Sequence, residues 1–283
     1  MEASSDGAEA RRFLQMRMAL GEITFDRAKH AIERRIRDQA VRWEWAFGAD
    51  ARRNRARLER LRDSCAGECV VVICNGPSLN RVDMNLVKEQ KSICMNRSYI
   101  MFDSWGFVPT YFTSINHLVL DQFSEDIKGL EMVKFVDFTH RRKLPENDGF
   151  LYFRIPPSFR DSFQPDLTRP ITSGGTVTYV SLQLAFYMGF AKVIIIGMDH
   201  RFSAVGTPNA SEIRSAEKDD DHVHPDYFPK GIKWQLPDLY RSELAYREAR
   251  TMFEKNGRRI IDATIDGACN VFEKMPLEKA LSA

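Results

Sequence analysis

The feature that most constrains the fold is a series of short apolar runs, each followed at once by small polar residues or glycine. Residues 70–74 lead into Asn75, and residues 193–196 lead into Gly197. Uninterrupted apolar runs of this length are typical of strands buried on both faces of a parallel sheet. In open α/β sheets, ligands bind beyond the carboxyl ends of such strands. The pattern therefore predicts one cleft lined by amides and hydroxyls, which suits a nucleotide that carries phosphate.

Strands alternate with helices from residue 68 onward, which predicts the fold class. We expect strands at 70–74, 92–95, 110–115, 132–138, 151–155, 192–196 and 259–262, and helices at 83–89, 118–127, 173–188 and 237–256. This order predicts an α/β fold with a doubly wound, mostly parallel sheet of the Rossmann-like, GT-A-like kind. The polar, irregular stretch at about 201–236 is expected to form a small lid.

The first 66 residues have a different character from the rest of the chain. We expect residues 1–66 to be a helical N-terminal extension and residues 67–283 to be the nucleotide-binding catalytic domain. The extension is rich in arginine, but acidic residues are interleaved with the arginines. This favours a helical hairpin that docks on the main domain or joins subunits of a homo-oligomer. The alternative is a basic arm that contacts an anionic membrane surface.

The composition narrows the class of protein. With 43% hydrophobic and 28% charged residues, the chain has the profile of a globular domain with a substantial core. The net charge of +2 gives no reason to expect a nucleic-acid partner. An odd number of cysteines argues against a disulfide framework. The chain shows neither a signal-peptide core nor an apolar run of bilayer length, so we expect a cytoplasmic protein, in the alternative peripheral to the inner membrane.

The loop after the first strand carries the first candidate ligand site. Asn75, Gly76, Pro77 and Ser78 follow that strand directly. Glycine allows the backbone to approach a ligand closely, proline fixes the turn, and exposed amides can hold phosphate or ribose oxygens. The loop matches neither the dinucleotide fingerprint nor the Walker loop. Taken alone, it is equally consistent with a tight strand-to-helix turn.

Two further segments supply candidate binding residues. Thr172, Ser173, Gly174 and Gly175 open the most apolar helix, where free N–H groups and the helix dipole favour an anion. The competing interpretation is an ordinary N-cap at Thr172 or Ser173. Asp199 ends a buried strand, where it could hold a ribose hydroxyl, orient an acceptor, or simply cap the following turn.

The lid carries the candidate catalytic groups. Asp219–Asp221 is followed by His222, His224 and Tyr227. Histidines beside aspartates can bind a metal, or they can supply a general base with a pKa near neutrality. We favour the base, because one contiguous loop rarely provides a complete metal cage. The remaining alternative is a solvated loop without a chemical role.

Taken together, these residues resemble the bacterial sialyltransferases of the Campylobacter type. They also resemble the related family that contains archaeal 6-hydroxymethylpterin diphosphokinase (MptE-like) and the motility accessory factors. The shared features, in chain order, are Asn75-Gly76-Pro77-Ser78-Leu79, Asn96-Arg97, Asn116, Ile171-Thr172-Ser173-Gly174 and Gly197-Met198-Asp199. The continuation Gly174-Gly175-Thr176-Val177 is closer to the second family.

The resemblance implies a function. It implies an inverting, metal-independent glycosyltransferase of bacterial surface-glycan synthesis, which transfers a sialic-acid-like sugar from a CMP-activated donor to a glycan acceptor without a cofactor. By the same resemblance, His224, or else His222, is the base in the lid. The implied donor contacts are the phosphate and ribose side for Asn75, Gly76 and Ser78, the cytidine and sugar for Asn96 and Asn116, and the carboxylate or phosphate for Thr172, Ser173 and Gly174.

One departure from the sialyltransferases concerns the leaving phosphate. Where they carry a tyrosine after the Gly-Ile-Asp segment, this chain has His200 and Arg201. Arg201 or Tyr227 is therefore expected to contact the phosphate instead. Two other functions stay open: a pterin diphosphokinase that uses ATP and Mg²⁺ held by Asp219–Asp221, and a non-catalytic nucleotide-binding scaffold.

Overall fold

The computed structural model describes residues 36, 38–158, 160–203, 208, 210–215 and 218–283. The chain divides into two compact units, Met1–Ala46 and Phe47–Ala283. In the first unit, the described residues from 38 to 46 are helical. Every element named below belongs to the second unit.

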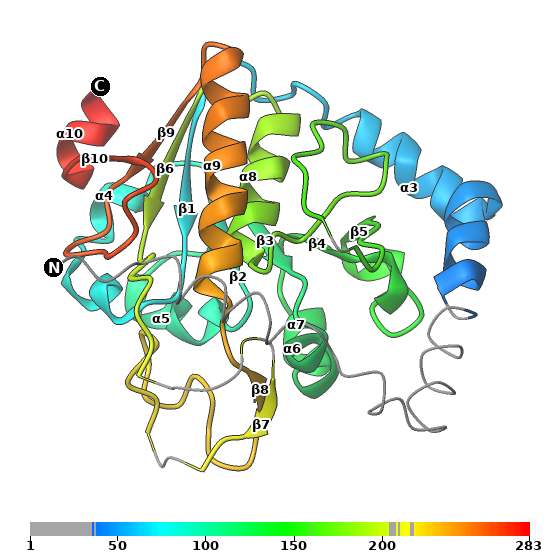
Figure 1. Cartoon of the computed structure of the whole chain (residues 1–283), viewed down its shortest axis with the longest axis horizontal. Coiled ribbons are helices and arrows are strands. Elements are labelled where there is room, and N and C mark those ends of the chain that lie inside the picture. Colours follow the sequence, from blue (N-terminus) through cyan, green and yellow to red (C-terminus); the bar gives the residue numbers. More distant parts are fainter. Residues whose placement is uncertain (1–35, 37, 159, 204–207, 209, 216–217) are drawn as a thin grey trace, which may run out of the picture. The chain divides into compact units, whose positions relative to one another are not determined.

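The second unit is built on a parallel sheet (Figure 1). Among the described residues this sheet has eight strands, in the order β10-β9-β6-β1-β2-β3-β4-β5. The chain runs outward from β1 to β5 and then returns to place β6 on the other side of β1, so the topological switch point lies between β1 and β6. The bounds are β1 (Cys69–Ile73), β2 (Ser92–Met95), β3 (Tyr111–Ser114), β4 (Val133–Asp137), β5 (Phe150–Phe153), β6 (Lys192–Ile196), β9 (Arg259–Asp262) and β10 (Glu273–Lys274). The prediction of a doubly wound α/β fold is confirmed.

Helices connect the strands and cover the sheet. Figure 1 shows helices α8 and α9 of the second unit side by side in front of the strands. The bounds are α3 (Ala49–Glu59), α4 (Asn85–Lys88), α5 (Phe102–Trp105), α6 (His117–Gln122), α7 (Ser124–Lys128), α8 (Val177–Tyr187), α9 (Leu239–Lys255) and α10 (Leu277–Ser282), with short 3₁₀ turns at η2 (Pro77–Arg81), η3 (Ser98–Met101), η4 (Phe138–His140) and η5 (Glu146–Asp148). The sequence did not predict β10 or α10.

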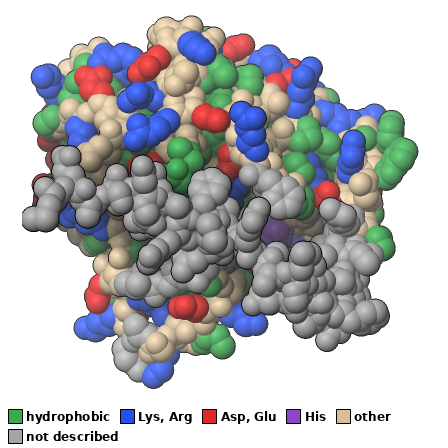
Figure 2. Space-filling view, in the orientation of Figure 1, with side chains coloured by type: hydrophobic (Ala, Val, Ile, Leu, Met, Phe, Trp, Pro, Cys, Tyr) green, Lys and Arg blue, Asp and Glu red, His purple; other side chains and the backbone are tan. Residues whose placement is uncertain are grey.

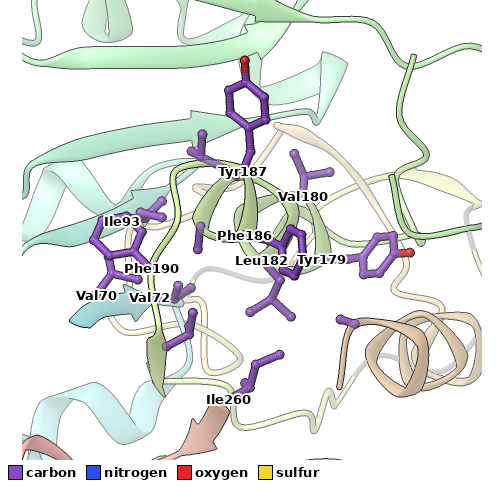
Figure 3. Packing of buried hydrophobic residues seen from close by; sticks show 14 of the residues in the cluster. Val70, Val72, Ile93, Tyr179, Val180, Leu182, Phe186, Tyr187, Phe190 and Ile260 are labelled. Atoms are coloured by element: carbon purple, nitrogen blue, oxygen red, sulfur yellow. The ribbon is translucent and has the colours of Figure 1, made fainter. Parts of the chain in front are cut away.

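Helix α8 forms the centre of the core. It packs on β1, β2, β3 and α9, and ten of its eleven residues are buried. Its labelled side chains point outward in several directions, with Tyr179, Leu182 and Tyr187 on different sides (Figure 3). A helix that is apolar all round must be surrounded by protein, and its sequence therefore specifies this central position. Burying a leucine such as Leu182 contributes about 1.5–3 kcal/mol.

Helix α3 covers the edge of the sheet at β5. The side chain of Asn54 donates to the carbonyl of Tyr152 at 2.7 Å and accepts from its N–H at 2.8 Å, so it pairs with the edge strand as another strand would. Arg57 donates to the carbonyl of Phe150, and Leu58 is fully buried in the core cluster. The expected domain boundary at residue 66 therefore has to move: α3 belongs to the α/β unit, which begins at Phe47.

The lid region contains regular structure that the sequence pattern did not indicate. β7 (Ser211–Ile213) and β8 (Lys233–Gln235) form an antiparallel hairpin. The side-chain amide of Gln122 on α6 donates to the carbonyl of Lys233 and accepts from its N–H, which ties β8 to the main body. Among the described helices, none is both long and apolar enough to cross a bilayer.

Candidate functional site

A pocket of about 490 Å³ lies at the carboxyl ends of the parallel strands. Residues that follow β6, β1, β2, β3 and β4 line it, together with the first residues of α8 and α9 and parts of the lid. This is where open α/β sheets bind ligands, because the loops diverge on either side of the switch point. On the described part of the face in Figure 2, Lys and Arg side chains are interspersed with Asp and Glu.

The loops after β1 and β6 are joined by a hydrogen-bonded carboxylate. Asp199 accepts from the hydroxyl of Ser78 at 2.6 Å and from its N–H at 3.2 Å. Gly76 lies so close that a Cβ there would stand 1.9 Å from Oδ2 of Asp199. Asp199 thus requires the glycine, for which the sequence left open close approach to a ligand or a tight turn. Gly76 and Asp199 line the pocket, while Pro77 and the buried Ser78 do not.

Three asparagines form a row along the next strand ends, and all three line the pocket. Asn75 donates to the carbonyl of Met95 at 3.1 Å, and its buried Oδ1 has no hydrogen-bond partner among the described residues. Asn96 adopts a left-handed conformation with φ of 52°, and its Oδ1 accepts from Ser114. Asn116 caps α6 by accepting from the N–H of Leu118. The structure therefore brings together the three amides that the sequence pointed to.

Helix α8 begins later than expected. Its N-cap is Thr176, whose hydroxyl accepts from the N–H of Thr178, so neither Thr172 nor Ser173 caps it. Thr172 exchanges hydrogen bonds with the backbone of Ser162 and lies outside the pocket, as does Gly174. Ser173, Gly175 and Thr176 line it. Of the residues at which an anion site was predicted, only Ser173 and Gly175 therefore line the pocket, next to Thr176, Val177 and Thr178.

Arg241 brings a fixed positive charge to the start of α8. Its guanidinium forms a bidentate pair with Asp161, with Nε 2.6 Å from Oδ2 and Nη2 2.9 Å from Oδ1. Burial raises the pKa of Asp161, but the hydrogen bond and charge of Arg241 lower it further, so the net pKa lies below its usual value. Of the described residues that line the pocket, only Arg241 and Arg201 are Lys or Arg. Arg241 was missed from sequence because no motif accompanies it.

The lid places a histidine–carboxylate pair at the pocket. Nδ1 of His222 lies 2.9 Å from Oδ2 of Asp219, a side chain with no exposed surface. Burial raises the pKa of Asp219, but His222 and then Arg214 lower it by more, so the carboxylate stays charged at neutral pH. The ring of Tyr227 stacks on His222, with centroids 4.2 Å apart and planes within 5°. Because a carboxylate can only accept, Nδ1 carries the proton of this hydrogen bond, and Nε2 is the nitrogen that remains available as a base.

The position of the lid is set by hydrogen bonds to the strand ends. The N–H of Val223 donates to the carbonyl of Asn75, and the N–H of Arg97 donates to the hydroxyl of Tyr227. These contacts hold His222 over the ends of β1 and β2. His224, the base preferred from sequence, is not among the residues that line the pocket, and its Nδ1 accepts from the N–H of Asp226. Tyr227 is fully buried, stacks on His222 and also lines the pocket.

The acidic run of the lid is used within the lid itself. Asp221 accepts from both the N–H and the hydroxyl of Ser203, while Asp219 serves His222. In the described parts of the chain, no three His, Cys, Asp or Glu residues are grouped so that they could share a metal ion. Asp219 and Asp221 are thus both engaged by groups of the protein.

A second histidine–carboxylate pair stands at the end of β6. His200 has a left-handed backbone with φ of 56°, and its Nε2 lies 3.2 Å from Oε1 of Glu243 on α9. Burial lowers the pKa of His200, and Glu243 opposes this effect only in part. Non-glycine residues in this conformation persist only where the surroundings hold them, often at functional sites. Arg201, next in the chain, is exposed and lines the pocket.

Residues at the end of β4 also line the pocket, and they were not predicted from the sequence. Asp137 accepts from the N–H of Thr139 and from that of Ile155, both at 2.7 Å, and so fixes the turn that carries His140. Burial raises the pKa of Asp137. The sequence signal that could have identified Asp137 is a polar residue at the end of a strand. Asp137 is the last residue of β4, and Asn116 comes soon after β3 in the same way.

The family model described as 6-hydroxymethylpterin diphosphokinase MptE-like matches residues 49–205. No curated protein matches the chain. Among solved structures, the chain is similar to the MAf glycosyltransferase from Magnetospirillum magneticum AMB-1, at 14% identity and a TM-score of 0.49. That similarity covers 77% of this chain and 35% of the other, so the chain spans about a third of that protein's length.

Proposed function

Since the chain belongs to the 6-hydroxymethylpterin diphosphokinase MptE-like family, we propose that it is a transferase acting on an activated nucleotide, and specifically a glycosyltransferase. The donor we propose is a CMP-activated, sialic-acid-like sugar, and the acceptor is a hydroxyl of a glycan. The family description by itself names a different reaction, so the choice between them rests on the side chains of the pocket.

The observation that carries the proposal is the Asp219–His222 pair at the pocket. Asp219 is buried and ionised, and it holds Nδ1 of His222 at 2.9 Å. A carboxylate in this position orients the ring and stabilises the imidazolium that forms when Nε2 takes a proton. A hydroxyl acceptor needs such a base as it attacks, whereas a nucleotide-binding scaffold does not.

The charges around the pocket suit a departing phosphate. The first N–H groups of α8 and the guanidinium of Arg241 lie together at one end of it, and Arg201 lines it beside β6. Its three lining carboxylates, Asp137, Asp199 and Asp221, each accept hydrogen bonds from the protein. Negative charge on a bound phosphate thus meets helix-dipole and guanidinium groups.

In the proposed reaction the acceptor oxygen attacks the anomeric carbon of the donor. Its proton passes to Nε2 of His222, and the bond from the anomeric carbon to the phosphate oxygen breaks. The electron pair leaves with CMP, whose phosphate is stabilised by α8 and Arg241. A single displacement of this kind inverts the configuration at the anomeric carbon. We propose that these cationic groups take the place of a metal ion.

The pterin diphosphokinase is the second candidate, because the family description names it. That reaction transfers a diphosphoryl group from ATP and depends on Mg²⁺ held by carboxylates and phosphates. The aspartates of the lid favour the glycosyltransferase over this candidate, because Asp219 and Asp221 are committed to His222 and Ser203.

Calorimetry on the full chain separates the two candidates. We expect CMP to bind in the presence of EDTA, and ATP with Mg²⁺ to bind more weakly than CMP. Binding of ATP with Mg²⁺ and none of CMP would establish the kinase instead. A ligand at about 100 times its Kd raises stability by about 2.7 kcal/mol, so a thermal-shift screen would rank the same nucleotides.

Release of CMP from CMP-N-acetylneuraminic acid then tests the base. His222→Ala should slow this release by about 10²–10⁴-fold, the usual contribution of a positioned general base. The matched control is His224→Ala, two residues along the same loop but outside the pocket, which should keep the parent rate. Loss of activity in H224A with full activity in H222A would contradict this assignment.

A further inference from the structure

The pocket reaches well beyond the strand ends at the switch point. Strand neighbours lie about 4.8 Å apart, so the end of β4 is about 14 Å from the end of β1. Asn116, His117, Thr139 and His140 line the pocket at the ends of β3 and β4. We name these four residues the imidazole lobe.

The imidazole lobe is held in place by its own hydrogen bonds. Asn116 caps α6 and so sets the position of His117, the first residue of that helix. Asp137 accepts from the N–H of Thr139 at 2.7 Å, and it also binds the N–H of Ile155 on the next strand. The turn that carries His140 is thereby fixed from two strands. A site built in this way can bind a ligand without first being ordered by it.

The chemistry of the imidazole lobe differs from that of the other end of the pocket. Arg201 and Arg241, the lining residues with a fixed positive charge, belong to the loop after β6 and to α9. The lobe offers two imidazoles, a hydroxyl and an amide. These groups both donate and accept hydrogen bonds, which suits sugar hydroxyls better than a phosphate.

Burial leaves the ring of His140 neutral at neutral pH. Burial lowers the pKa of His140, the charges of His117 and Lys143 act in the same direction, and Asp121 opposes them. Nδ1 of His140 lies 3.2 Å from the hydroxyl of Thr139, so Nε2 is the nitrogen left for a ligand. Because Nδ1 is engaged by Thr139, the neutral ring of His140 offers a ligand one hydrogen bond through Nε2, which a sugar hydroxyl can either donate or accept.

We propose, on the basis of the proposed function, that the imidazole lobe binds the hydroxyl-bearing acceptor through His117 and His140. The donor phosphate lies at the opposite end, beside α8 and Arg241. His222 is held over the ends of β1 and β2 and therefore stands between the two substrates, where the base of the transfer is needed.

Histidine side-chain NMR tests directly whether donor and acceptor occupy opposite ends of the pocket. The chain has six histidines, few enough for their ring signals to be assigned by single substitutions. We expect CMP to shift the signals of His200 and His222 and to leave those of His117 and His140 in place. Shifts of His117 and His140 with CMP alone would overturn the proposal. No shift at any histidine, with no binding by calorimetry, would overturn the proposed function and this inference with it.

Kinetics with lactose as the acceptor probe provides the second test. Lactose should accelerate CMP release from CMP-N-acetylneuraminic acid. His140→Ala should raise the KM for lactose by about tenfold, the effect of losing one hydrogen bond to a hydroxyl. The KM for the donor should move by less than the KM for lactose, and His117→Ala should behave in the same way. His224→Ala is the control.

The proposal is overturned if CMP release depends on the lactose concentration in the same way in the parent and in H140A. It is also overturned if lactose has no effect on CMP release in either protein. A rise in donor KM without a change for lactose would place the transferred sugar in the imidazole lobe and would overturn it as well.

Discussion

The hydroxyl of Ser78 donates a 2.6 Å hydrogen bond to the carboxylate of Asp199, and this bond joins the loops on either side of the switch point. Both loops turn away from neighbouring parallel strands, β1 and β6, and the pocket opens beside them. The buried serine thus serves the geometry of the site without lining it. The carboxylate of Asp199, held by this serine, occupies the space that a Cβ at residue 76 would need.

Gly76→Ala should destabilise the protein by about 1–3 kcal/mol, the usual cost of overpacking. The new Cβ would lie 1.9 Å from Oδ2 of Asp199 and 2.7 Å from the carbonyl oxygen of Gly197. Chemical denaturation measures the effect. Gly129→Ala is the matched control, because its backbone is helical with φ of −65° and its Cβ would meet nothing closer than 3.5 Å. The idea fails if both variants unfold at the same denaturant concentration.

Arg241→Ala should weaken the binding of CMP by about tenfold, equivalent to about 1.4 kcal/mol, because in the proposed complex the guanidinium faces the phosphate. Asp161 holds Nε and Nη2, and Nη1 makes no hydrogen bond within the described structure. Calorimetry with cytidine, which lacks the phosphate, is the control and should change by less than twofold. Equal losses for CMP and cytidine would mean that Arg241 acts only by holding the loop of Asp161.

The free energy of unfolding should fall on acidification in two stages. Burial lowers the pKa of His140 and His200, and Asp161 and Asp219 also have lowered pKa values when the opposing effects are summed. Each of these groups binds a proton more readily in the unfolded chain. The stability they contribute is therefore complete above their unfolded pKa and is lost as pH falls, first below about 6.5 for the histidines and then below about 3.9 for the aspartates.

The slope of the first stage should be at most about 1.4 kcal/mol per pH unit for each proton taken up on unfolding. Asp137, whose pKa is raised by burial, acts in the opposite direction and reduces the second stage. Urea denaturation at a series of pH values measures both stages. The double variant H140Q/H200Q should flatten the first stage and keep the second, and an unchanged first stage in that variant would refute the assignment.

Removal of residues 1–46 should leave a cooperatively folding protein, whereas removal of residues 1–66 should not. The longer deletion removes the fully buried Leu58, whose truncation alone would cost about 2–5 kcal/mol. It also removes Asn54 and exposes the edge of β5. Thermal unfolding of both fragments decides the matter, with Asn54→Ala in the full chain as a milder version. If the fragment that starts at residue 67 melts as the parent does, α3 is dispensable.

The alternation of strands and helices could be predicted because buried parallel strands need continuous apolar runs, and each run here is short and bounded. Residues 192–196 and 259–262 were expected as strands, and the structure has β6 and β9 at these bounds. Membership of the MptE-like family was also evident from short polar segments in a fixed order. β10 was missed because its two residues, Glu273 and Lys274, are both charged and provide no apolar run.

The candidate site was predicted where a polar residue directly follows a strand, as Asn75, Asn96 and Asn116 do. Prediction failed where a side chain reaches the pocket from an element that does not directly follow a strand. Arg241 is the third residue of the long helix α9. It reaches the pocket because Asp161, 80 residues earlier in the chain, forms an ion pair with it. The choice between His222 and His224 likewise depended on which ring meets Asp219, and two positions in one loop cannot be ranked by sequence.

Local sequence by itself determined the class of the fold and the edge of the sheet where the site lies, because both follow from runs of apolar residues and what comes after them. Tertiary structure alone decided what each polar group does there. Gly76 and Ser78 serve Asp199, His222 rather than His224 meets a buried carboxylate, and His140 shares a pocket with them. The physical reason is that hydrogen bonds and close approach depend on distances between residues far apart in the chain, which only the folded sheet sets.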